Sequence, residues 1–412
     1  MKIKKIVLFF AALLAAAGLF AGGEKESGQK VLNFWYWDQN GTAPYEQLFS
    51  EFEAQNPGIK VNLVISPWAD YWTKLQTALP TGTGPDIFWL NHPNAVSYLP
   101  TKLVMDLEAI AGDIHFENFD KNFYIPFVYE GRRYGVPVFW DATMLYYNKA
   151  LFDKAGIPYP GADWTWADMI NAAGKLTIKE GNRTLQYGIA IDYSAQSGFS
   201  NFVLQNGGRL FSDDRMRSVI NSPEGREAMQ MQLDMIHKYG YAPTIQVMQE
   251  TTKSTLFQSG TVAMVTNQTG ILKQWAEILG KNLGIAPLPR QKQRASIYHN
   301  LAYAASSKTK YPEETKKLLV FLASKRHSDV LSKVWATCYN GGTDQFYSVY
   351  NWLDTKYISE AISYGYPLPI AGKNAGAVYT LAETEMAKIM QTPQVGNSLA
   401  AYEKTLNAAI SR

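Results

Sequence analysis

The residues with the clearest potential for chemistry are Asp38, Asp86 and Asp141, each placed where a predicted strand ends or the chain crosses between strands. Two carboxyl groups about 5 to 9.5 Å apart can hydrolyse a glycosidic bond held between them. A carboxylate in a binding pocket instead accepts hydrogen bonds from hydroxyl groups. For Asp141 we favour ligand binding over a structural role at a hinge and over catalysis. Asp86 is explained at least as well by capping of nearby backbone amides.

Aromatic side chains are abundant, with 11 Trp and 25 Tyr, and many stand in polar, loop-like contexts. Sugar rings have apolar faces that stack on flat side chains, so this excess mildly indicates carbohydrate binding. An aromatic-rich core would explain it too. The three rings that we expect near a ligand are those of Trp37, Trp140 and Trp275.

Neutral hydrogen-bonding groups follow the same predicted strands and crossings, and they suit hydroxyl recognition. The candidates are Asn40, Asn91, His92, Asn300 and Tyr339. The histidines lack partners at metal-ligand spacing, and no metalloprotease, serine-hydrolase or phosphate-loop motif occurs in the sequence. We therefore expect no metal, no cofactor and no catalytic residue.

The elements that must position these residues begin with three apolar strands predicted at 31–37, 59–65 and 86–90. Helices are predicted to start at Pro44 and Trp68, between the strands. Strands and helices in this order predict a parallel sheet covered by helices. Ligands of such sheets bind beside the carboxyl ends of the strands.

A crossing predicted at 137–147 carries Trp140 and Asp141 into a second set of elements. Helices are predicted at 166–176, from Ser222-Pro223 to a stop at Gly240, and at 271–279, with strands at 187–191 and 262–265. The chain of 412 residues exceeds what one core usually organises, so two α/β domains are expected.

Four stretches carry a resemblance to a known family. They are Val136-Pro137 with Asp141 and LYYNK at 145–149, FQSGTVAM at 257–264, GIAPLP at 284–289, and SKTKYPEETKKLLVFLAS at 307–324. The chain resembles the family 1 extracellular solute-binding proteins, the receptor subunits of bacterial ABC sugar importers, from Val31 to Arg412. One departure is Gly270, where many members have a stacking aromatic residue. Trp275, one turn further on, would either take the place of that ring or serve helix packing, and the sequence leaves both open.

The resemblance implies two Rossmann-like α/β lobes of the type II periplasmic-binding-protein class, joined by three crossings at 137–147, 283–288 and 335–346. The N-terminal lobe would comprise 31–140 and 289–335, and the C-terminal lobe 141–288 and 336–412. A sugar held between the lobes would close them. The closed, monomeric form would then deliver the sugar to ABC permease subunits in the inner membrane, without enzymatic action.

The amino terminus has the order of a secretory signal peptide at 1–21, with Lys2, Lys4 and Lys5 before an apolar run and Ala21 before Gly22. Residues 22–30 are expected to form a flexible linker. Gly22 stands where a lipoprotein would need cysteine, so we expect a periplasmic protein without a lipid anchor. The net charge of +3 is too small to indicate nucleic acid.

Two other readings stay open from the sequence. Within the binding class, the cargo could be a glycerol phosphodiester or a polyamine, although no cluster of basic or acidic residues marks either. In a different class, the paired carboxylates could belong to an exported glycoside hydrolase.

Overall fold

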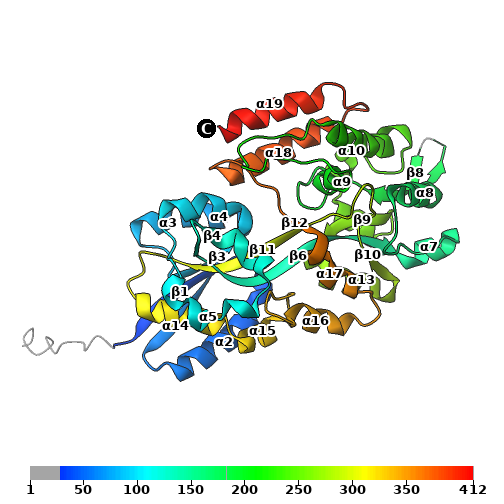
Figure 1. Ribbon diagram of the computed structural model, residues 1–412. Coiled ribbons are helices and arrows are strands. Elements are labelled where there is room, and N and C mark those ends of the chain that lie inside the picture. The colour runs from blue at the N-terminus through cyan, green and yellow to red at the C-terminus, as the bar shows by residue number, and fades with distance from the viewer. Residues whose placement is uncertain (1–27, 182, 412) are drawn as a thin grey trace, which may run out of the picture.

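The computed structural model describes residues 28–181 and 183–411. The predicted signal peptide and most of the predicted linker lie outside the described residues. One mixed sheet of ten strands runs through the molecule, in the order β2-β1-β3-β11-β6-β9-β8-β7, with β10 beside β6 and β12 beside β11. Helices cover the sheet on both sides of a narrower middle, which gives the molecule two halves (Figure 1).

The half built mainly from the amino-terminal third has a parallel core, as predicted. Strand β1 pairs in parallel with both β2 and β3, and helices drawn in blue and yellow surround these strands (Figure 1). Its main elements are β1 (Lys30–Tyr36), α2 (Thr42–Gln55), β2 (Ile59–Ile65), α3 (Trp68–Thr81), β3 (Ile87–Asn91), α4 (His92–Tyr98), α5 (Ala111–Ile114), α6 (Lys121–Tyr124), the hairpin β4 (Val128–Tyr129) and β5 (Arg132–Arg133), α14 (Pro312–Leu322) and α15 (Lys325–Leu331).

The other half carries the middle and the end of the chain. Strand β8 pairs in parallel with β9 and antiparallel with β7. Its elements are α7 (Lys149–Ala155), α8 (Trp166–Leu176), β7 (Ile178–Glu180), β8 (Arg183–Ala190), α9 (Phe199–Gln205), α10 (Pro223–Leu233), a π-helix (Asp234–Lys238), α11 (Ile245–Glu250), α12 (Lys253–Gln258), β9 (Val262–Gln268), α13 (Leu272–Leu279), β10 (Leu283–Ala286), α16 (Gly342–Tyr347), α17 (Lys356–Ala361), β12 (Gly365–Pro367), α18 (Ala375–Ile389) and α19 (Ser398–Ile410).

Two long strands join the halves. Strand β6 (Val136–Asn148) pairs with β11 (Ser296–Ala305) through its first part and with β9 and β10 through its second part. Strand β11 also pairs with β3, deep in the first half. A third segment, 336–338, lies against β6, where the Trp140 amide donates to the Ala336 carbonyl at 3.0 Å. The molecule therefore has three crossings.

The middle crossing differs from the sequence prediction. Residues 283–288 were expected to return the chain to the first half, but β10 pairs only with positions 145–148 of β6, inside the second half. The return is made by β11. An apolar run predicts a buried strand but not the strand with which it pairs. The sequence pattern therefore did not distinguish β10 from β11 as the strand that returns to the first half. The lobe boundaries given above remain a prediction.

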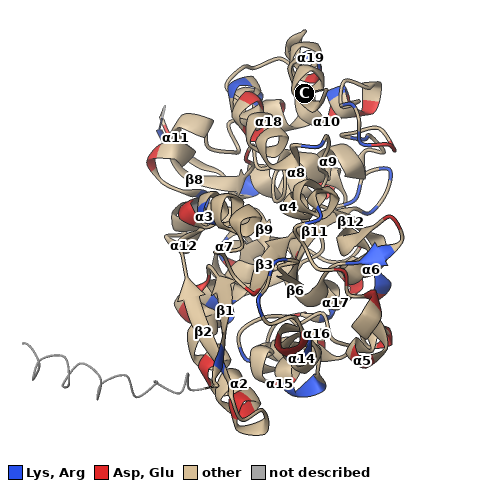
Figure 2. Cartoon of the chain, turned by 90° about the vertical axis from the view of Figure 1, so that its left-hand side faces the viewer, with Lys and Arg blue, Asp and Glu red and all other residues tan. Residues whose placement is uncertain are grey.

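Local signals set several helix ends as predicted. Thr165 and Asp168 form a reciprocal capping box at the start of α8, and the Ser222 side chain accepts from the Gly225 amide before α10. Among the described helices, none has the length and apolarity needed to cross a bilayer. Lys and Arg residues are interspersed with Asp and Glu residues in both halves (Figure 2).

Candidate ligand-binding site

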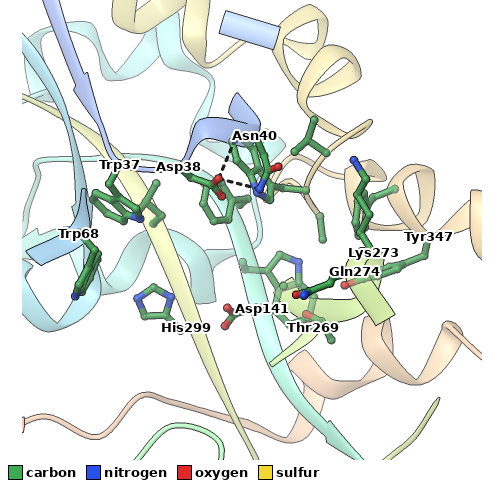
Figure 3. A pocket seen from close by; sticks show the side chains of 18 of the residues that line it. Trp37, Asp38, Asn40, Trp68, Asp141, Thr269, Lys273, Gln274, His299 and Tyr347 are labelled. Atoms are coloured by element: carbon green, nitrogen blue, oxygen red, sulfur yellow. Dashed lines mark hydrogen bonds between the residues drawn. The ribbon is translucent and has the colours of Figure 1, made fainter. Parts of the chain in front are cut away.

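A cavity of about 540 Å³ lies where the two halves meet β6 and β11. Its walls come from opposite halves, with Trp37 and Trp68 on one side, Lys273, Gln274 and Tyr347 on the other, and Asp141 and His299 between them (Figure 3). The full lining is Trp37, Asp38, Asn40, Trp68, Phe139, Trp140, Asp141, Thr269, Gly270, Lys273, Gln274, Glu277, His299, Leu301, Val334, Trp335, Ala336, Phe346 and Tyr347.

The wall from the first half is aromatic. Trp37 directly follows β1, and its ring meets the edges or faces of Trp68, Tyr71, Trp72 and Trp89 at centroid distances of 4.8 to 5.6 Å. These four rings pack around the Trp37 ring and so restrict its rotation. Trp68 begins α3 and is 49% exposed, a high value for so large an apolar side chain. A rigid ring and an exposed ring thus stand together on one wall.

The turn after Trp37 adds polar groups to this wall. The Asp38 carboxylate accepts hydrogen bonds from the backbone amide and the side-chain amide of Asn40, both at 2.9 Å. This arrangement is a local Asx turn, favoured by aspartate two residues before an amide donor. It holds Asp38 and Asn40 beside Trp37, as the sequence predicted for all three.

The floor of the cavity comes from β6 and β11. Successive side chains of a strand point to opposite faces, so Phe139 and Asp141 share one face and Trp140 lies on the other. Phe139 stacks on Trp335 with centroids 4.7 Å apart and planes at 18°. Asp141 lies opposite His299 in the β6–β11 pairing, and both line the cavity.

Asp141 is electrostatically unusual. Burial raises the pKa of its carboxyl group to about 7, although hydrogen bonds from the Gln196 side chain and the His299 backbone oppose this. Burial also lowers the pKa of His299 to about 4, which keeps that ring neutral. The floor therefore presents one carboxyl group and one neutral imidazole beside aromatic rings.

The wall from the second half holds residues that the sequence analysis missed. Lys273, Gln274 and Glu277 of α13 and Gly270 of the 3-10 turn before it (Thr269–Ile271) are separated by three or four residues, so they share one face. The buried face carries Leu272, Trp275 and Ala276. This polar stripe directly after the FQSGTVAM strand is a signal that could have identified them.

Three side chains that were predicted to approach the ligand do not point into the cavity. They belong to Trp275, Asn300 and Trp140. Trp275 has no exposed surface and lies in the core between Tyr146 and Phe257, so it does not replace the missing ring at Gly270. Asn300 belongs to β11 and not to a loop, and it points away from the cavity to donate to the Phe123 carbonyl. Because successive side chains of a strand point to opposite faces, the neighbouring His299 reaches the cavity.

Trp140 and Tyr339 lie together behind β6. The Trp140 ring packs on Phe123 at 5.2 Å, and its indole nitrogen donates to the Thr343 hydroxyl at 2.8 Å. Trp140 borders the main cavity but directs its ring to a separate one of about 140 Å³, which Tyr339 also lines. Tyr339 packs on Phe119 at 5.6 Å. These contacts serve the hinge region, not the main cavity.

Asp86, Asn91 and His92 lie outside the cavity, and the side chains of Asp86 and Asn91 make structural hydrogen bonds. Asp86 accepts from the Asn33 amide at 2.8 Å and from the Thr309 hydroxyl, which fits the capping role considered for it. Asn91 caps α4 by accepting from the Asn94 amide. His92 is 2% exposed, and burial lowers its pKa to about 3. In the described part of the chain, no group of three or more metal-ligating side chains occurs.

A cavity between two α/β halves joined by crossing strands is the architecture of a receptor for small solutes. A family model described as bacterial extracellular solute-binding protein matches residues 47–337. The chain belongs to this family. The match confirms the resemblance seen in the four sequence stretches and places this solute-binding protein in an extracellular family.

Relatives and solved structures agree with that assignment. A Brucella abortus relative, whose name says only that it is a binding protein, is 27% identical over 291 residues, covering 69% of each chain. A galactooligosaccharide-binding protein of Bacillus subtilis is 24% identical over 337 residues, covering 79% of this chain and 78% of its own. The substrate-binding protein Lmo0181 of Listeria monocytogenes, solved with cycloalternan, is 25% identical and superposes with a TM-score of 0.82 over 93% of this chain and 99% of its own. The type II fold predicted from the sequence is thereby confirmed.

Proposed function

We propose that this solute-binding protein captures a mono- or oligosaccharide in the cavity and delivers it to an ABC-type importer of the inner membrane. The observation that carries the proposal is the combination of the Trp37–Trp68 wall with the half-buried Asp141 side chain across one cavity. Aromatic faces suit the apolar faces of sugar rings, and a carboxylate accepts hydrogen bonds from hydroxyl groups. The sugars named for the Bacillus and Listeria relatives support the same ligand class.

The charges in the cavity disfavour an anionic cargo. Its lining has carboxyl groups at Asp38, Asp141 and Glu277 against one lysine, Lys273, and no arginine. A glycerol phosphodiester would bring its negative charge beside these three carboxyl groups, which Lys273 alone offsets in the lining. A polyamine fits the charge balance better but makes poor use of the aromatic wall.

Binding would couple to closure of the two halves. A ligand that contacts Trp37 on one wall and Gln274 on the other stabilises a closed form, because only that form makes both sets of contacts. The closed monomer is the state that we propose the permease recognises. We also propose that the precursor is exported, cut near Ala21, and works in the periplasm without an acyl anchor. Mass spectrometry of the exported protein tests this, and an intact Met1 or an acyl mass would contradict it.

A ligand screen by thermal shift and calorimetry tests the function. The panel contains gluco-, galacto- and arabino-oligosaccharides, cycloalternan, spermidine and glycerophosphocholine. A sugar at 100 times its dissociation constant should raise the unfolding free energy by about 2.7 kcal/mol. Chromatography of the same incubations separates binding from hydrolysis: unchanged sugar at a stoichiometric ratio supports a receptor, and released products would support a glycosidase. Binding of spermidine or glycerophosphocholine alone would overturn the saccharide assignment.

A further inference from the structure

A heavily hydrogen-bonded loop lies beside the cavity floor, against Asp141 and Thr143 of β6. Residues 191–198 join β8 to α9, and side chains from three other elements hold them. The Thr266 hydroxyl donates to the Ser197 carbonyl at 2.6 Å, the Lys253 ammonium donates to the Ser197 hydroxyl at 2.7 Å, and the Ala195 amide donates to Glu383 at 2.9 Å. So many partners fix the loop relative to β9, α12 and α18.

The turn at the end of this loop is too tight for a larger residue. A Cβ atom at Gly198 would lie 2.2 Å from the carbonyl oxygen of Asp192. Asp192 itself forms an ion pair with Lys253 at 2.6 Å, with both side chains 15% exposed. The turn at Gly198 therefore packs tightly against Asp192. The largely buried ion pair of Asp192 with Lys253 ties the same part of the loop to α12.

Gln196 is the loop residue that reaches Asp141. Its carbonyl oxygen accepts from the Thr143 hydroxyl at 2.9 Å and from the Asn201 side-chain amide at 2.8 Å, and both of those side chains are fully buried. Its own side-chain amide donates to Asp141 Oδ1 at 3.1 Å. Asp141 and Thr143 are two residues apart on one face of β6. Gln196 is therefore hydrogen-bonded to β6 at both Asp141 and Thr143.

The second anchor of Gln196 leads to the other crossing strand. Asn201, which donates to the Gln196 carbonyl, also accepts from the Ile297 amide of β11 at 2.8 Å. The contact to Asp141 therefore rests on both long strands that pass between the halves. Because every link is buried or half-buried, the Gln196 side chain has little freedom to turn away.

The two oxygens of the Asp141 carboxyl group have different surroundings. The His299 backbone donates to the carboxyl group and the Gln196 amide donates to Oδ1, whereas Oδ2 lies on the side of Gly270, where a Cβ atom would be 3.8 Å from it. Gly270 lines the cavity and has no side chain to cover that oxygen. An amide N–H can only donate, so it favours Asp141 in its accepting, ionised form.

We propose that Gln196 is a positioning residue, which occupies Oδ1 of Asp141 and so presents Oδ2 to a hydroxyl group of the bound saccharide. This inference rests on the proposed function and adds a specificity to it. The ligand group that meets Asp141 must be a hydrogen-bond donor, so a sugar with a carboxylate at that position is rejected. Gln196 itself does not line the cavity.

The test uses the titration of Asp141, which the surrounding groups also influence. Those that face it from neighbouring elements are His299 on β11, Tyr146 on β6, Tyr347 on α16, and Lys273 and Glu277 on α13. All are left unchanged in the variants. The carboxyl signal of Asp141 in ¹³C NMR is assigned by its loss in Asp141→Asn, and its midpoint is followed in the full-length mature protein.

Four proteins are compared: wild type, Gln196→Leu, Gln196→Glu and the control Gln246→Leu. Gln196→Leu removes the donor, so the Asp141 midpoint should move upward and affinity for cycloalternan, or for the tightest-binding sugar of the panel, should fall roughly tenfold. Gln196→Glu sets a second carboxyl group beside Asp141 and should raise the midpoint further. Gln246→Leu is the matched control, because Gln246 is exposed on α11 and its amide also faces a carboxylate, Glu250, at 3.4 Å.

The outcomes separate the two proposals. If wild type binds no saccharide, the proposed function fails and the positioning role fails with it. If wild type binds a saccharide and Gln196→Leu binds it equally well with an unchanged Asp141 midpoint, only the positioning role is overturned. A loss of affinity with no movement of the midpoint would indicate general damage to the fold and would also overturn it. Loss of affinity with an upward midpoint, absent in Gln246→Leu, supports it.

Discussion

The ring of Trp68 meets the ring of Trp37 edge-on, with centroids 5.0 Å apart and planes at 81°. Trp37 is the fixed partner, since other aromatic rings surround it, whereas Trp68 leaves 49% of its surface in contact with solvent. Two rings at right angles offer a corner into which the apolar face and the edge of a sugar ring can both fit.

Trp68→Ala should weaken saccharide binding about fivefold to tenfold, because it removes one side of that corner. The melting temperature without ligand should change little, since the side chain is half exposed. Calorimetry and melting curves measure the two effects. Leu185→Ala is a suitable control, because Leu185 is 42% exposed on β8 and away from the cavity. Equal affinities for wild type and Trp68→Ala would remove Trp68 from the binding wall.

Asp141→Asn should separate stability from binding. Because burial raises the pKa of Asp141 from 3.8 to about 7, the folded state holds a proton that the unfolded state has released between those values. Asp141 therefore makes stability fall as the pH rises from about 4 to about 7. The asparagine variant lacks this fall, so ligand-free Asp141→Asn should melt higher than wild type at pH 8, with a smaller difference at pH 4.

Saccharide affinity of the same variant should fall tenfold or more at pH 8, through loss of a charge-assisted hydrogen bond. Calorimetry at both pH values measures this. A variant that is both less stable without ligand and unchanged in affinity would assign Asp141 to the hinge, as the sequence analysis had considered.

Trp140→Phe should act on stability and not on affinity. The change removes the hydrogen bond from the indole nitrogen to Thr343 but keeps a ring against Phe123. We expect a loss of about 1 kcal/mol in unfolding free energy and a change in affinity below about twofold. Denaturant unfolding and calorimetry check the pair of values. A tenfold loss of affinity at unchanged stability would mean that the ring faces the ligand after all.

Closure of the two halves should be visible in solution. The cavity walls lie on opposite halves (Figure 3), so a ligand that bridges them draws the halves together. Small-angle scattering should give a smaller radius of gyration with saturating cycloalternan, or the tightest-binding panel sugar, than without it. Wild type with spermidine serves as a comparison, and an identical radius in all three samples would argue against a clamp.

Much of the fold could be read from the sequence, because local signals determine local structure. The capping box at Thr165 and the proline after Ser222 each set a helix start. The parallel order of β1, β2 and β3 follows from alternating strands and helices. The confusion of β10 with β11 arose because strand partners are chosen by long-range pairing, which no local pattern encodes.

Of the residues predicted for the site, Trp37, Asp38, Asn40 and Asp141 line the cavity, and the first three adjoin a strand end. Trp37, Asp38 and Asn40 lie in one short turn directly after β1. The prediction of where that strand ends therefore also located these three residues. Elsewhere, a prediction that was wrong by one position named the wrong residue. Asn300 faces away from the cavity, while its neighbour His299 lines it. In an extended strand each step along the chain exchanges the two faces, and the sequence marked both residues as polar.

The strand order has a consequence for when the chain can fold. In the first half, β11 lies between β3 and β6 and joins them. A nascent chain that has not yet reached Ala305 therefore has a gap in the middle of that sheet, with the inner edges of β3 and β6 unpaired. Contacts between such distant segments form slowly. Completion of the sheet is thus delayed until about three quarters of the 412-residue chain has been synthesised.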